Sequence, residues 1–474
     1  MRLCPHVAKP GASVNRRRDK VVTRREEFCM SVRESAAASG EQGAATTNTA
    51  PTRRTIAAAT VGTALEMYDF VLYGSAAALV FAPLFFPKID ATAGTLAAFA
   101  TFGVGFVARP IGGMIFGHFG DIIGRKRVLV ITMIAMGVSS TLIGMLPTYE
   151  TIGVWAPILL VTLRLIQGVA MGGEQGGAFV LAAEADGPHS RRRGFLGSWP
   201  AVGMAGGLVL ATLIFGAFAR LEPDVFLAWG WRVPFWLSAL IVGAGLAVRL
   251  SVPEPSVFQT VKSENGTVKA PLIEAIRRYW KQILLVIGMK SGETAAFFLI
   301  ATFSVAYGSQ TLGLPAANIL NAVLIAAVFQ MIAIPLWGAL SDKIGRRPVM
   351  IFGASFLTLF AAPFFMLLNT KSLPLIYVAL ILAMSLGHAA LSAPVGAFFA
   401  ELFPTRVRLS GVNLGVQLTA MLAGGFTPLI ATALLAAVGH FWPVAVYIAA
   451  LALVSLIATI LTRETFKSGT LPVD

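Results

Sequence analysis

The chain contains 474 residues, of which 56% are hydrophobic and only 13% charged, and its formal net charge is +14. Soluble globular proteins carry about 25% charged residues, so a water-facing surface over most of this chain is excluded, as are collagen, coiled coil and disorder. The only two cysteines, Cys4 and Cys29, cannot form a disulfide framework or a four-ligand metal site.

Residues 1–54 form a basic segment with 11 Lys and Arg against 5 Asp and Glu. The segment lacks an apolar stretch followed by a small-residue cleavage site, which is evidence against a cleaved secretory signal. We expect a disordered basic cytoplasmic tail. An equal alternative is that translation starts at Met30, because residues 1–29 show neither helical nor strand periodicity.

From residue 55 onward, turn residues and charges divide the chain into twelve apolar segments. A membrane-spanning helix needs about 20 such residues. The expected spans are 55–82, 94–117, 128–147, 152–180, 195–219, 233–251, 282–307, 318–340, 349–368, 374–399, 410–434 and 441–462. We therefore expect an N-terminal six-helix bundle (55–251), a cytoplasmic linker (252–281), a C-terminal six-helix bundle (282–465) and a C-terminal tail (466–474).

Basic residues are distributed unevenly over the connectors between these segments. If alternate connectors face opposite sides, sixteen Lys and Arg lie on one side and about four on the other. Because Lys and Arg favour the cytoplasmic side, both termini and the central linker are expected in the cytoplasm. The positive charge thus reports topology and requires no nucleic-acid partner.

A connector motif occurs twice: the stretch from Gly117 to Val128 recurs from Gly338 to Val349, 221 residues later. Parallel six-helix repeats related by an axis along the membrane normal are the architecture of one large transporter class. The two copies predict a cytoplasmic gate that latches the halves together. Its expected residues are Arg109, Gly117, Asp121, Gly124, Arg125, Asp342, Gly345 and Arg346. For Arg127 and Arg193 we favour the simpler interpretation that they mark the cytoplasmic side of the membrane and take no part in the gate.

Two acidic residues lie within the first span. Ionisable groups inside a membrane helix cost a few kcal/mol and indicate function. Glu66 and Asp69 are three residues apart, so they share one face near the middle of the bilayer. Mutual repulsion and desolvation favour the neutral form of one of them, as a proton carrier requires. The alternative for each is a neutral side chain that hydrogen-bonds to a neighbouring helix.

The fourth span carries a polar stripe. Arg164, Gln167, Met171 and Glu174 follow one another at steps of 3, 4 and 3, which predicts a single face turned to the bundle interior. Arg164 is the natural partner for Asp69 or for a substrate carboxylate, because guanidinium binds carboxylate through a two-pronged fork.

The seventh span adds Lys290 and Glu293, again three residues apart, and the alternative for this pair is a purely structural ion pair. His388 could titrate near neutrality, but a lone histidine more often makes an interhelical hydrogen bond. The sequence contains no Walker-type phosphate loop and no paired histidines of metalloprotease spacing. We expect that the protein is not an enzyme and binds no metal or cofactor. If it is a transporter, we favour protons as the ion that drives transport.

Several motifs resemble those of the major facilitator superfamily and, within it, the metabolite:H+ symporter family. The repeated connector is similar to the superfamily signature. Segments similar to the narrower family are Ala64–Phe70, Gly105–Gly113, Arg164–Gly168, Gly172–Gly177, Arg193–Trp199, Trp229–Phe235 and Ala400–Arg406. The resemblance covers residues 55 to about 465 and is nearest to the shikimate-transporter-like branch. Met67 and Lys290 depart from it, since the family usually has Trp and that branch favours Arg at these positions.

The resemblance implies an all-α membrane protein with twelve transmembrane helices in two pseudo-symmetric six-helix bundles. It also implies proton-coupled uptake of a small organic solute across the bacterial inner membrane. The usual solute is a carboxylate such as shikimate, a dicarboxylate, 2-oxoglutarate or an aromatic acid.

We expect alternating access by a monomer whose partners are the solute, protons and the lipid bilayer. The expected proton-coupling residues are Asp69 and Glu66, and the expected substrate-binding residues are Tyr73, Arg164, Gln167, Glu174, Gln175, Lys290 and Glu293. Efflux of drugs or metabolites by proton antiport is the first alternative. A non-transporting membrane sensor is the second, although it would need an output domain.

Overall fold

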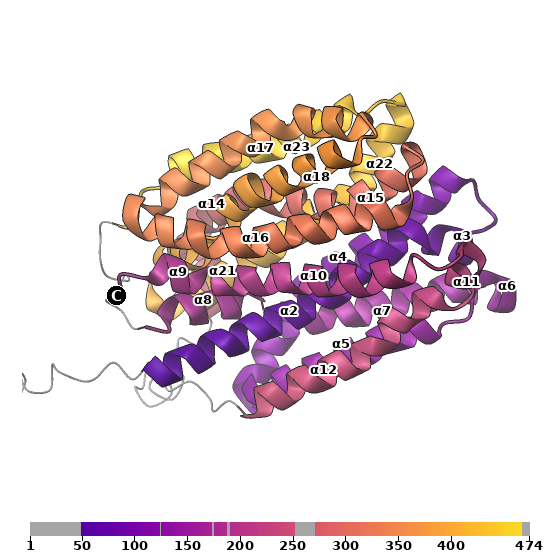
Figure 1. The fold of residues 1–474 in the computed structure, drawn as a ribbon. Coiled ribbons are helices and arrows are strands. Elements are labelled where there is room, and N and C mark those ends of the chain that lie inside the picture. The colour runs from indigo at the N-terminus through magenta and orange to yellow at the C-terminus, as the bar shows by residue number, and fades with distance from the viewer. Residues whose placement is uncertain (1–48, 124, 173–174, 187–189, 252–270, 467–474) are drawn as a thin grey trace, which may run out of the picture. The chain divides into compact units, whose positions relative to one another are not determined.

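The computed structural model describes residues 49–123, 125–172, 175–186, 190–251 and 271–466, and every regular element in these ranges is a helix (Figure 1). Residues Thr52–Asp474 form one compact unit. The helices lie side by side along a common direction, as long apolar helices do when each must satisfy its own backbone hydrogen bonds in lipid.

The described residues of the first half form six long elements. They are α2 (Thr49–Leu79), α4 (Ala91–Ile123), α5 (Arg125–Met145), α7 (Trp155–Met171) continued by α8 (Gln175–Glu184), α9 (Arg193–Gly197) continued by α10 (Trp199–Phe218), and α12 (Val233–Ser251). Short helices connect them at one end: α3 (Phe81–Phe85), α6 (Tyr149–Ile152) and α11 (Pro223–Ala228). We call this end the α11 end and the opposite one the α9 end (Figure 1).

The second half again contains six long elements. They are α14 (Pro271–Phe298) with η3 (Leu299–Phe303), α15 (Ser304–Ala306) and η4 (Tyr307–Thr311); α16 (Ala316–Ile344); α17 (Arg346–Asn369); α18 (Leu373–Leu382) with η5 (Ala383–His388), α19 (Ala389–Ser392) and α20 (Val395–Glu401); α21 (Thr405–Thr419) with η6 (Ala420–Gly425) and α22 (Thr427–Val438); and α23 (Trp442–Leu461).

The number and order of the spans are confirmed. Within the described residues, ten helices are long and apolar enough to cross a membrane, and the shorter apolar helices Val130–Met145 and Trp155–Met171 fall where the third and fourth spans were expected. Large apolar side chains such as Leu240, Leu336 and Leu359 are 66–78% exposed, which lipid tolerates and water does not. The chain is therefore a multi-pass membrane protein with the expected twelve-helix fold.

Two details differ from the expected spans. In the fourth span α7 ends at Met171 and Gly172 caps it, and residues 173–174 lie outside the described part of the chain. The seventh begins at Pro271 instead of residue 282, and Tyr279 within it has non-helical angles (φ −119°, ψ 23°). Hydropathy does not register either feature, because both keep the apolar composition and change only the local backbone geometry.

Four π-helical turns, η3, η4, η5 and η6, interrupt the long helices of the second half. A π turn accommodates one extra residue, so it rotates the side chains that follow it, and such turns are frequent at functional sites. Lys290, Glu293 and His388 lie in or beside these interrupted helices.

Glycines bring α4 and α7 into close contact. A Cβ atom on Gly112 would lie 1.9 Å from the Val169 carbonyl oxygen, and one on Gly172 would lie 1.9 Å from the Arg109 carbonyl oxygen. Only glycine permits this approach of the two backbones. The contact fixes the height of Arg164 on α7 relative to the aromatic side chains of α4.

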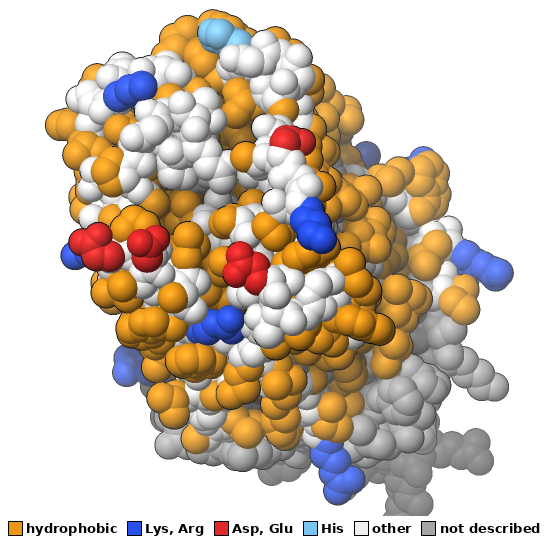
Figure 2. All heavy atoms as spheres, turned by 90° about the vertical axis from the view of Figure 1, so that its right-hand side faces the viewer, with side chains coloured by type: hydrophobic (Ala, Val, Ile, Leu, Met, Phe, Trp, Pro, Cys, Tyr) orange, Lys and Arg blue, Asp and Glu red, His pale blue; other side chains and the backbone are white. Residues whose placement is uncertain are grey.

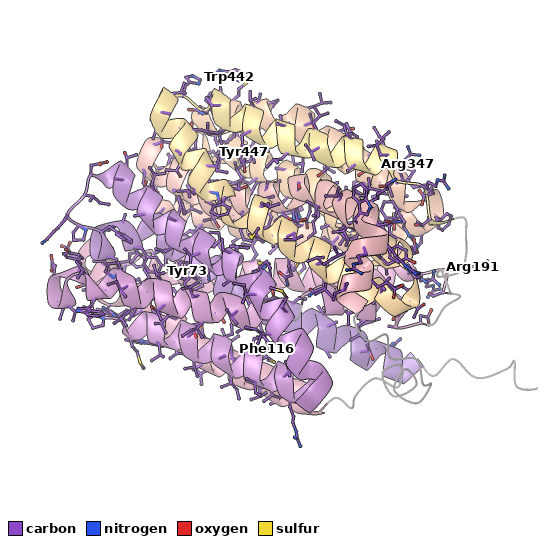
Figure 3. The ribbon with its side chains drawn as sticks, turned by 180° about the vertical axis from the view of Figure 1, so that it is seen from behind. Tyr73, Phe116, Arg191, Arg347, Trp442 and Tyr447 are labelled. Carbon is purple, nitrogen blue, oxygen red and sulfur yellow. The ribbon has the colours of Figure 1, made fainter. Side chains whose placement is uncertain are left out.

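The two halves meet along α10 with α16, and along α4 with η6, α21 and α22. At the α11 end the surface mixes apolar side chains with scattered acidic and basic ones (Figure 2). Arg191 and Arg347 lie at the α9 end, whereas Trp442 lies at the opposite end and Tyr73 in the interior (Figure 3).

Candidate functional site

Asp69 is buried in the first half between α2, α5 and α12. Its Oδ1 accepts a hydrogen bond of 2.8 Å from the Ser238 hydroxyl on α12, and the Ser140 hydroxyl on α5 also hydrogen-bonds to its carboxyl group. Two hydroxyls suit a carboxyl group in either protonation state, because a hydroxyl can donate to the ionised form and accept from the neutral one.

A relay of side chains connects Asp69 to Arg164. The Gln167 amide donates to the Ser140 hydroxyl at 2.6 Å, and Arg164 Nη1 donates to Gln167 Oε1, also at 2.6 Å. Arg164 was expected to be the natural partner of Asp69. Gln167 and Ser140 instead lie between them, although the two charges still attract each other electrostatically.

Aromatic rings surround the Arg164 guanidinium. Its Cζ lies 4.0 Å from the ring centroids of Phe70 and of Tyr73, and 5.1 Å from that of Phe102. The Tyr73 hydroxyl donates to Thr101 at 2.8 Å, which fixes the ring. Arg164 Nε and Nη2 are buried and make no hydrogen bond within the described part of the chain. These two donors are on the guanidinium fork that binds carboxylates.

Glu66 and Arg109 are both buried near this site and attract each other electrostatically. The Arg109 guanidinium packs 4.1 Å from the Phe70 centroid and 4.3 Å from the Phe106 centroid, and its Nη2 lies 3.6 Å from Met171 Sδ. Arg109 was expected at the gate beside Asp121. The side chain of Asp121 is outside the described residues, so that prediction stands untested, and the described contacts of Arg109 include the aromatic side chains around Arg164.

The second half contains its own buried charged cluster. Lys290 Nζ lies 2.7 Å from Glu293 Oε2, so these residues form an ion pair, and their role in substrate binding remains a prediction. Glu293 Oε1 lies 3.4 Å from His388 Nε2, and His388 Nδ1 lies 2.7 Å from the Gln330 amide nitrogen. The histidine thus makes the interhelical contacts that sequence reasoning favoured, and Gln330 is a member that it missed.

A layer of aromatic rings separates the two clusters. Phe298 of α14 makes edge contacts with Phe102 and Phe106 of α4, with centroid distances of 5.6 and 5.1 Å. Lys290 Nζ lies 5.7 Å from the ring centroid of Phe179 on α8. Each cluster therefore borders the interface between the halves through aromatic side chains.

At the α9 end, Asp342 joins the two halves. Its carboxylate accepts the backbone N–H groups of Gly194 and Phe195, each at 2.8 Å, and the Arg346 guanidinium at 2.6 Å. A Cβ atom on Gly194 would lie 2.6 Å from the Gly338 carbonyl oxygen, so α9 and α16 approach closely only because that residue is glycine. We call Asp342 and its partners the latch.

Glu401 extends the latch. Its Oε1 lies 3.5 Å from Arg346 and 3.7 Å from Arg193, so it connects the second half to the first. The interpretation of Arg193 as a residue that only marks the cytoplasmic side was wrong, because its side chain is buried in this ion pair. Arg408 and Glu184 form a further ion pair between the halves.

The end of α23 leads into the latch. Glu464 accepts the backbone N–H groups of Arg346 and Arg347 at 3.1 and 3.0 Å, so it caps the start of α17. Gly345 precedes this helix with φ 106°, a backbone conformation that other residues rarely adopt. The Thr465 hydroxyl donates to Glu401.

Several expected site residues lie outside the residues whose side chains the structure describes. They are Glu174 and Gln175 in the substrate site, and Gly117, Asp121, Gly124 and Arg125 in the gate. Their assignments remain predictions.

At the α11 end the halves are joined by neutral partners and one arginine. The Gln310 amide donates to the Ala78 carbonyl oxygen at 2.8 Å and its oxygen accepts from Thr95 at 3.2 Å. Arg220 donates to Asn321 at 2.9 Å. Among the described residues both ends of the interface are thus bridged, and the ion pairs between the halves lie at the α9 end.

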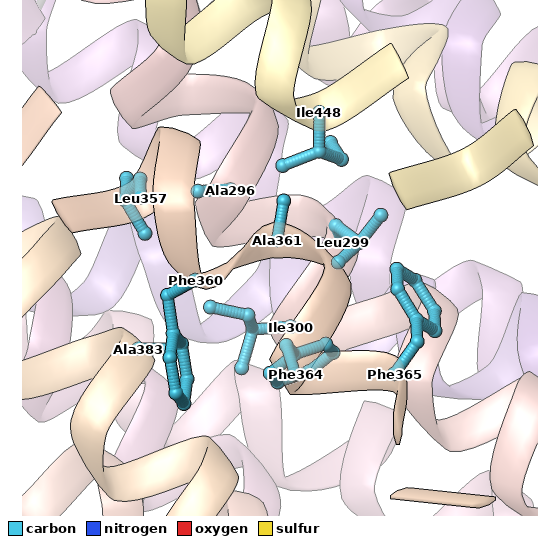
Figure 4. Close-up of a pocket in the computed structure, with 10 residues that line it drawn as sticks. All are labelled: Ala296, Leu299, Ile300, Leu357, Phe360, Ala361, Phe364, Phe365, Ala383 and Ile448. Atoms are coloured by element: carbon cyan, nitrogen blue, oxygen red, sulfur yellow. The ribbon is translucent and has the colours of Figure 1, made fainter. Parts of the chain in front are cut away.

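A small cavity lies inside the second half between α14, α17 and η5 (Figure 4). Leu299, Ile300, Leu357 and Phe364 are among the side chains that line it, and the whole lining is apolar. Such a lining offers nothing to a charged solute. The polar groups that could bind one are those of the two buried clusters.

The fold and sequence can be compared with known proteins. Residues 55–274 match the family described as sugar (and other) transporter, and residues 294–472 match the family described as major facilitator superfamily. The D-xylose-proton symporter structure superposes with a TM-score of 0.66 at 19% identity, covering 88% of this chain and 99% of that one.

Two bacterial transporters are much more similar in sequence to this chain than the xylose symporter is. The shikimate transporter of Escherichia coli (strain K12) is 40% identical over 88% of this chain and 95% of its own length. The inner membrane metabolite transport protein YhjE of the same organism is 39% identical over 87% and 94%. The chain belongs to the major facilitator superfamily of membrane transporters, in the metabolite:H+ symporter family and its shikimate-transporter-like branch.

Proposed function

We propose that the protein is a proton-coupled symporter that takes up a small organic carboxylate by alternating access. It would act as a monomer in the bacterial inner membrane, with both termini in the cytoplasm. The observation that carries the proposal is Arg164, a fully buried cation with two unfilled guanidinium donors between aromatic rings. A carboxylate would supply both missing acceptors and neutralise the charge.

The relay through Gln167 and Ser140 supports coupling between solute and proton. An anion bound to Arg164 would withdraw the cation from Asp69, and the ionised form of Asp69 would then become costly in its buried setting. Proton binding at Asp69 would therefore accompany solute binding at Arg164. Glu66, paired electrostatically with Arg109, is the second acidic candidate.

Lys290 is the second cation proposed for the carboxylate, and in this conformation Glu293 neutralises it. A solute carboxylate would compete with Glu293 for Lys290, and Glu293 would keep His388 and the Thr294 hydroxyl as partners. The latch at the α9 end supports a gate on the proposed cytoplasmic side, because its contacts connect parts of the chain that must separate for that side to open.

The relatives support the substrate class, since one is named a shikimate transporter and another a metabolite transport protein. The test is uptake by cells or proteoliposomes of a panel of labelled organic acids that begins with shikimate, with and without an uncoupler. Alkalinisation of the external medium on solute addition is expected for symport. Acidification would instead favour efflux by proton antiport, and uptake of none of the acids would contradict the carboxylate class.

Asp69→Asn should abolish uphill accumulation of the transported acid while exchange of internal for external solute continues, because exchange needs no net proton movement. The matched control is Asp90→Asn, which removes an exposed acid from the α11 end and should leave accumulation unchanged. Uphill accumulation that persists undiminished in Asp69→Asn would refute the role of Asp69.

A further inference from the structure

The start of α14 carries an exposed apolar face that the transport site does not use. Ile273, Ile276 and Trp280 are 52%, 48% and 51% exposed, and Leu284 continues the same line. Ile273 and Ile276 are three residues apart and share one side of the helix before Tyr279, and Trp280 is the first residue after that kink. We call Ile273, Ile276 and Trp280 the α14 stripe.

Three exposed basic residues lie beside the stripe: Arg277, Arg278 and Lys281. We call them the basic flank. Arg277 follows Ile276 and Lys281 follows Trp280 in the sequence, whereas the buried residues Ala275 and Ile283 face the bundle. Arg278 also lies 3.6 Å from Glu274, one turn earlier on the helix. Lys281 Nζ lies 5.6 Å from the Trp280 ring centroid.

The bundle holds this segment at a defined height. The backbone of Tyr279 departs from helical angles, and its ring contacts Phe403 with a centroid distance of 6.4 Å. Phe403 follows Glu401 of the latch by two residues, so the segment lies at the α9 end of the second half. Below it, Leu284 begins the lipid-facing side of the spanning part of α14.

We propose that the start of α14 is an anionic-lipid site, in which the α14 stripe enters the edge of the bilayer and the basic flank binds the phosphate groups of anionic phospholipids. The stripe is continuous with the lipid-facing side of α14, which favours lipid over a protein partner as its occupant. Tryptophan prefers the membrane–water interface, and basic side chains next to an apolar helical face are attracted to anionic headgroups.

Lipid retention tests the basic flank. The purified full-length protein is equilibrated with equal amounts of phosphatidylglycerol and phosphatidylcholine, and the lipids that it retains are counted by native mass spectrometry. The wild type should retain phosphatidylglycerol preferentially. The variant with Arg277→Gln, Arg278→Gln and Lys281→Gln should lose about tenfold or more of that preference, because it removes the positive charges that attract the anionic headgroups.

The control variant removes the same charge from other connectors at the α9 end: Arg127→Gln, Arg191→Gln and Arg192→Gln. These arginines are also exposed. The control should keep the preference for phosphatidylglycerol. An equal loss in both variants would mean that attraction to the whole basic end suffices, and no preference in the wild type would mean that no anionic-lipid site exists. Either result overturns the proposal.

Depth measurements test the stripe separately. Spin labels are attached at Ile276→Cys or at Arg278→Cys in a background with Cys4→Ser and Cys29→Ser, and the protein is reconstituted in phosphatidylcholine containing phosphatidylglycerol. The label at position 276 should collide mainly with oxygen, which dissolves in lipid, and the label at 278 mainly with a water-soluble relaxation agent. Equal exposure of both labels to the water-soluble agent would contradict insertion of the stripe.

Discussion

Replacement of Asp342 by asparagine should open the α9 end. The Asp342 carboxylate accepts two backbone N–H groups from the other half, those of Gly194 and Phe195, and a guanidinium from Arg346. Both of its oxygens therefore face donors. In either orientation the asparagine amide would place its own N–H group against one of them, and the negative charge would be lost.

The size of the effect follows from these contacts. A hydrogen bond to a charged group contributes about 1.5–3 kcal/mol, and asparagine should lose one such bond and weaken the other. We expect the closed α9 end to be destabilised by about 2–3 kcal/mol, which shifts the open-to-closed ratio about 30- to 150-fold.

Pulsed electron spin resonance can measure this shift. Spin labels at Arg191→Cys and Lys343→Cys report the separation of the halves at the α9 end, because both residues are exposed and lie on opposite halves. Cys4 and Cys29 are replaced by serine in this background. Asp342→Asn should move population from the short distance to a longer one.

The control is Arg347→Gln. Arg347 is basic and near the latch, but its guanidinium donates to the Ile460 carbonyl oxygen within the same half. The distance distribution should not change in this variant. An unchanged distribution in Asp342→Asn, or an equal shift in the control, would refute the idea that the Asp342 contacts hold the α9 end closed.

Two further variants test the buried clusters. In Gly105→Ala the new Cβ would lie 2.5 Å from Arg164 Nε, so the guanidinium must move. The KM of the transported acid should therefore rise about 10- to 100-fold. The control is Gly243→Ala, which has open space around the new Cβ and should leave KM unchanged. Glu293→Gln leaves Lys290 buried without its counter-ion, a cost of about 3–5 kcal/mol, and should lower the Tm in detergent. Adding Lys290→Met should recover most of that Tm, and a double variant no more stable than the single one would contradict the ion-pair explanation.

The spans were predictable because the length and apolarity of each segment depend only on the residues of that segment. The end of α7 at Met171 and the π turns were not, because they change backbone hydrogen bonding without changing composition. The charged residues of both buried clusters were also identifiable, since an ionisable group inside a span stands out against an apolar background.

The neutral partners of those residues were not predictable. Ser140 and Ser238 are small hydroxyl residues that occur throughout spanning helices, and nothing in their local sequence relates them to Asp69. Arg193 and Glu401 are more than two hundred positions apart, so only the fold brings them together. A search for acidic residues opposite each basic connector could have suggested the pairing of Arg193 with Glu401.

The buried charges divide between the halves in a way that affects how the halves move. Asp69, with its relay to Arg164, lies wholly in the first half, and the Lys290–Glu293 pair lies wholly in the second. Among the described residues, the acid–base pairs that cross between the halves, such as Arg193 with Glu401, lie at the α9 end. Rocking of the halves would therefore separate opposite charges at the α9 end and leave the interior pairs intact. The electrostatic cost of the motion therefore falls on the α9 end, while the interior charges stay paired.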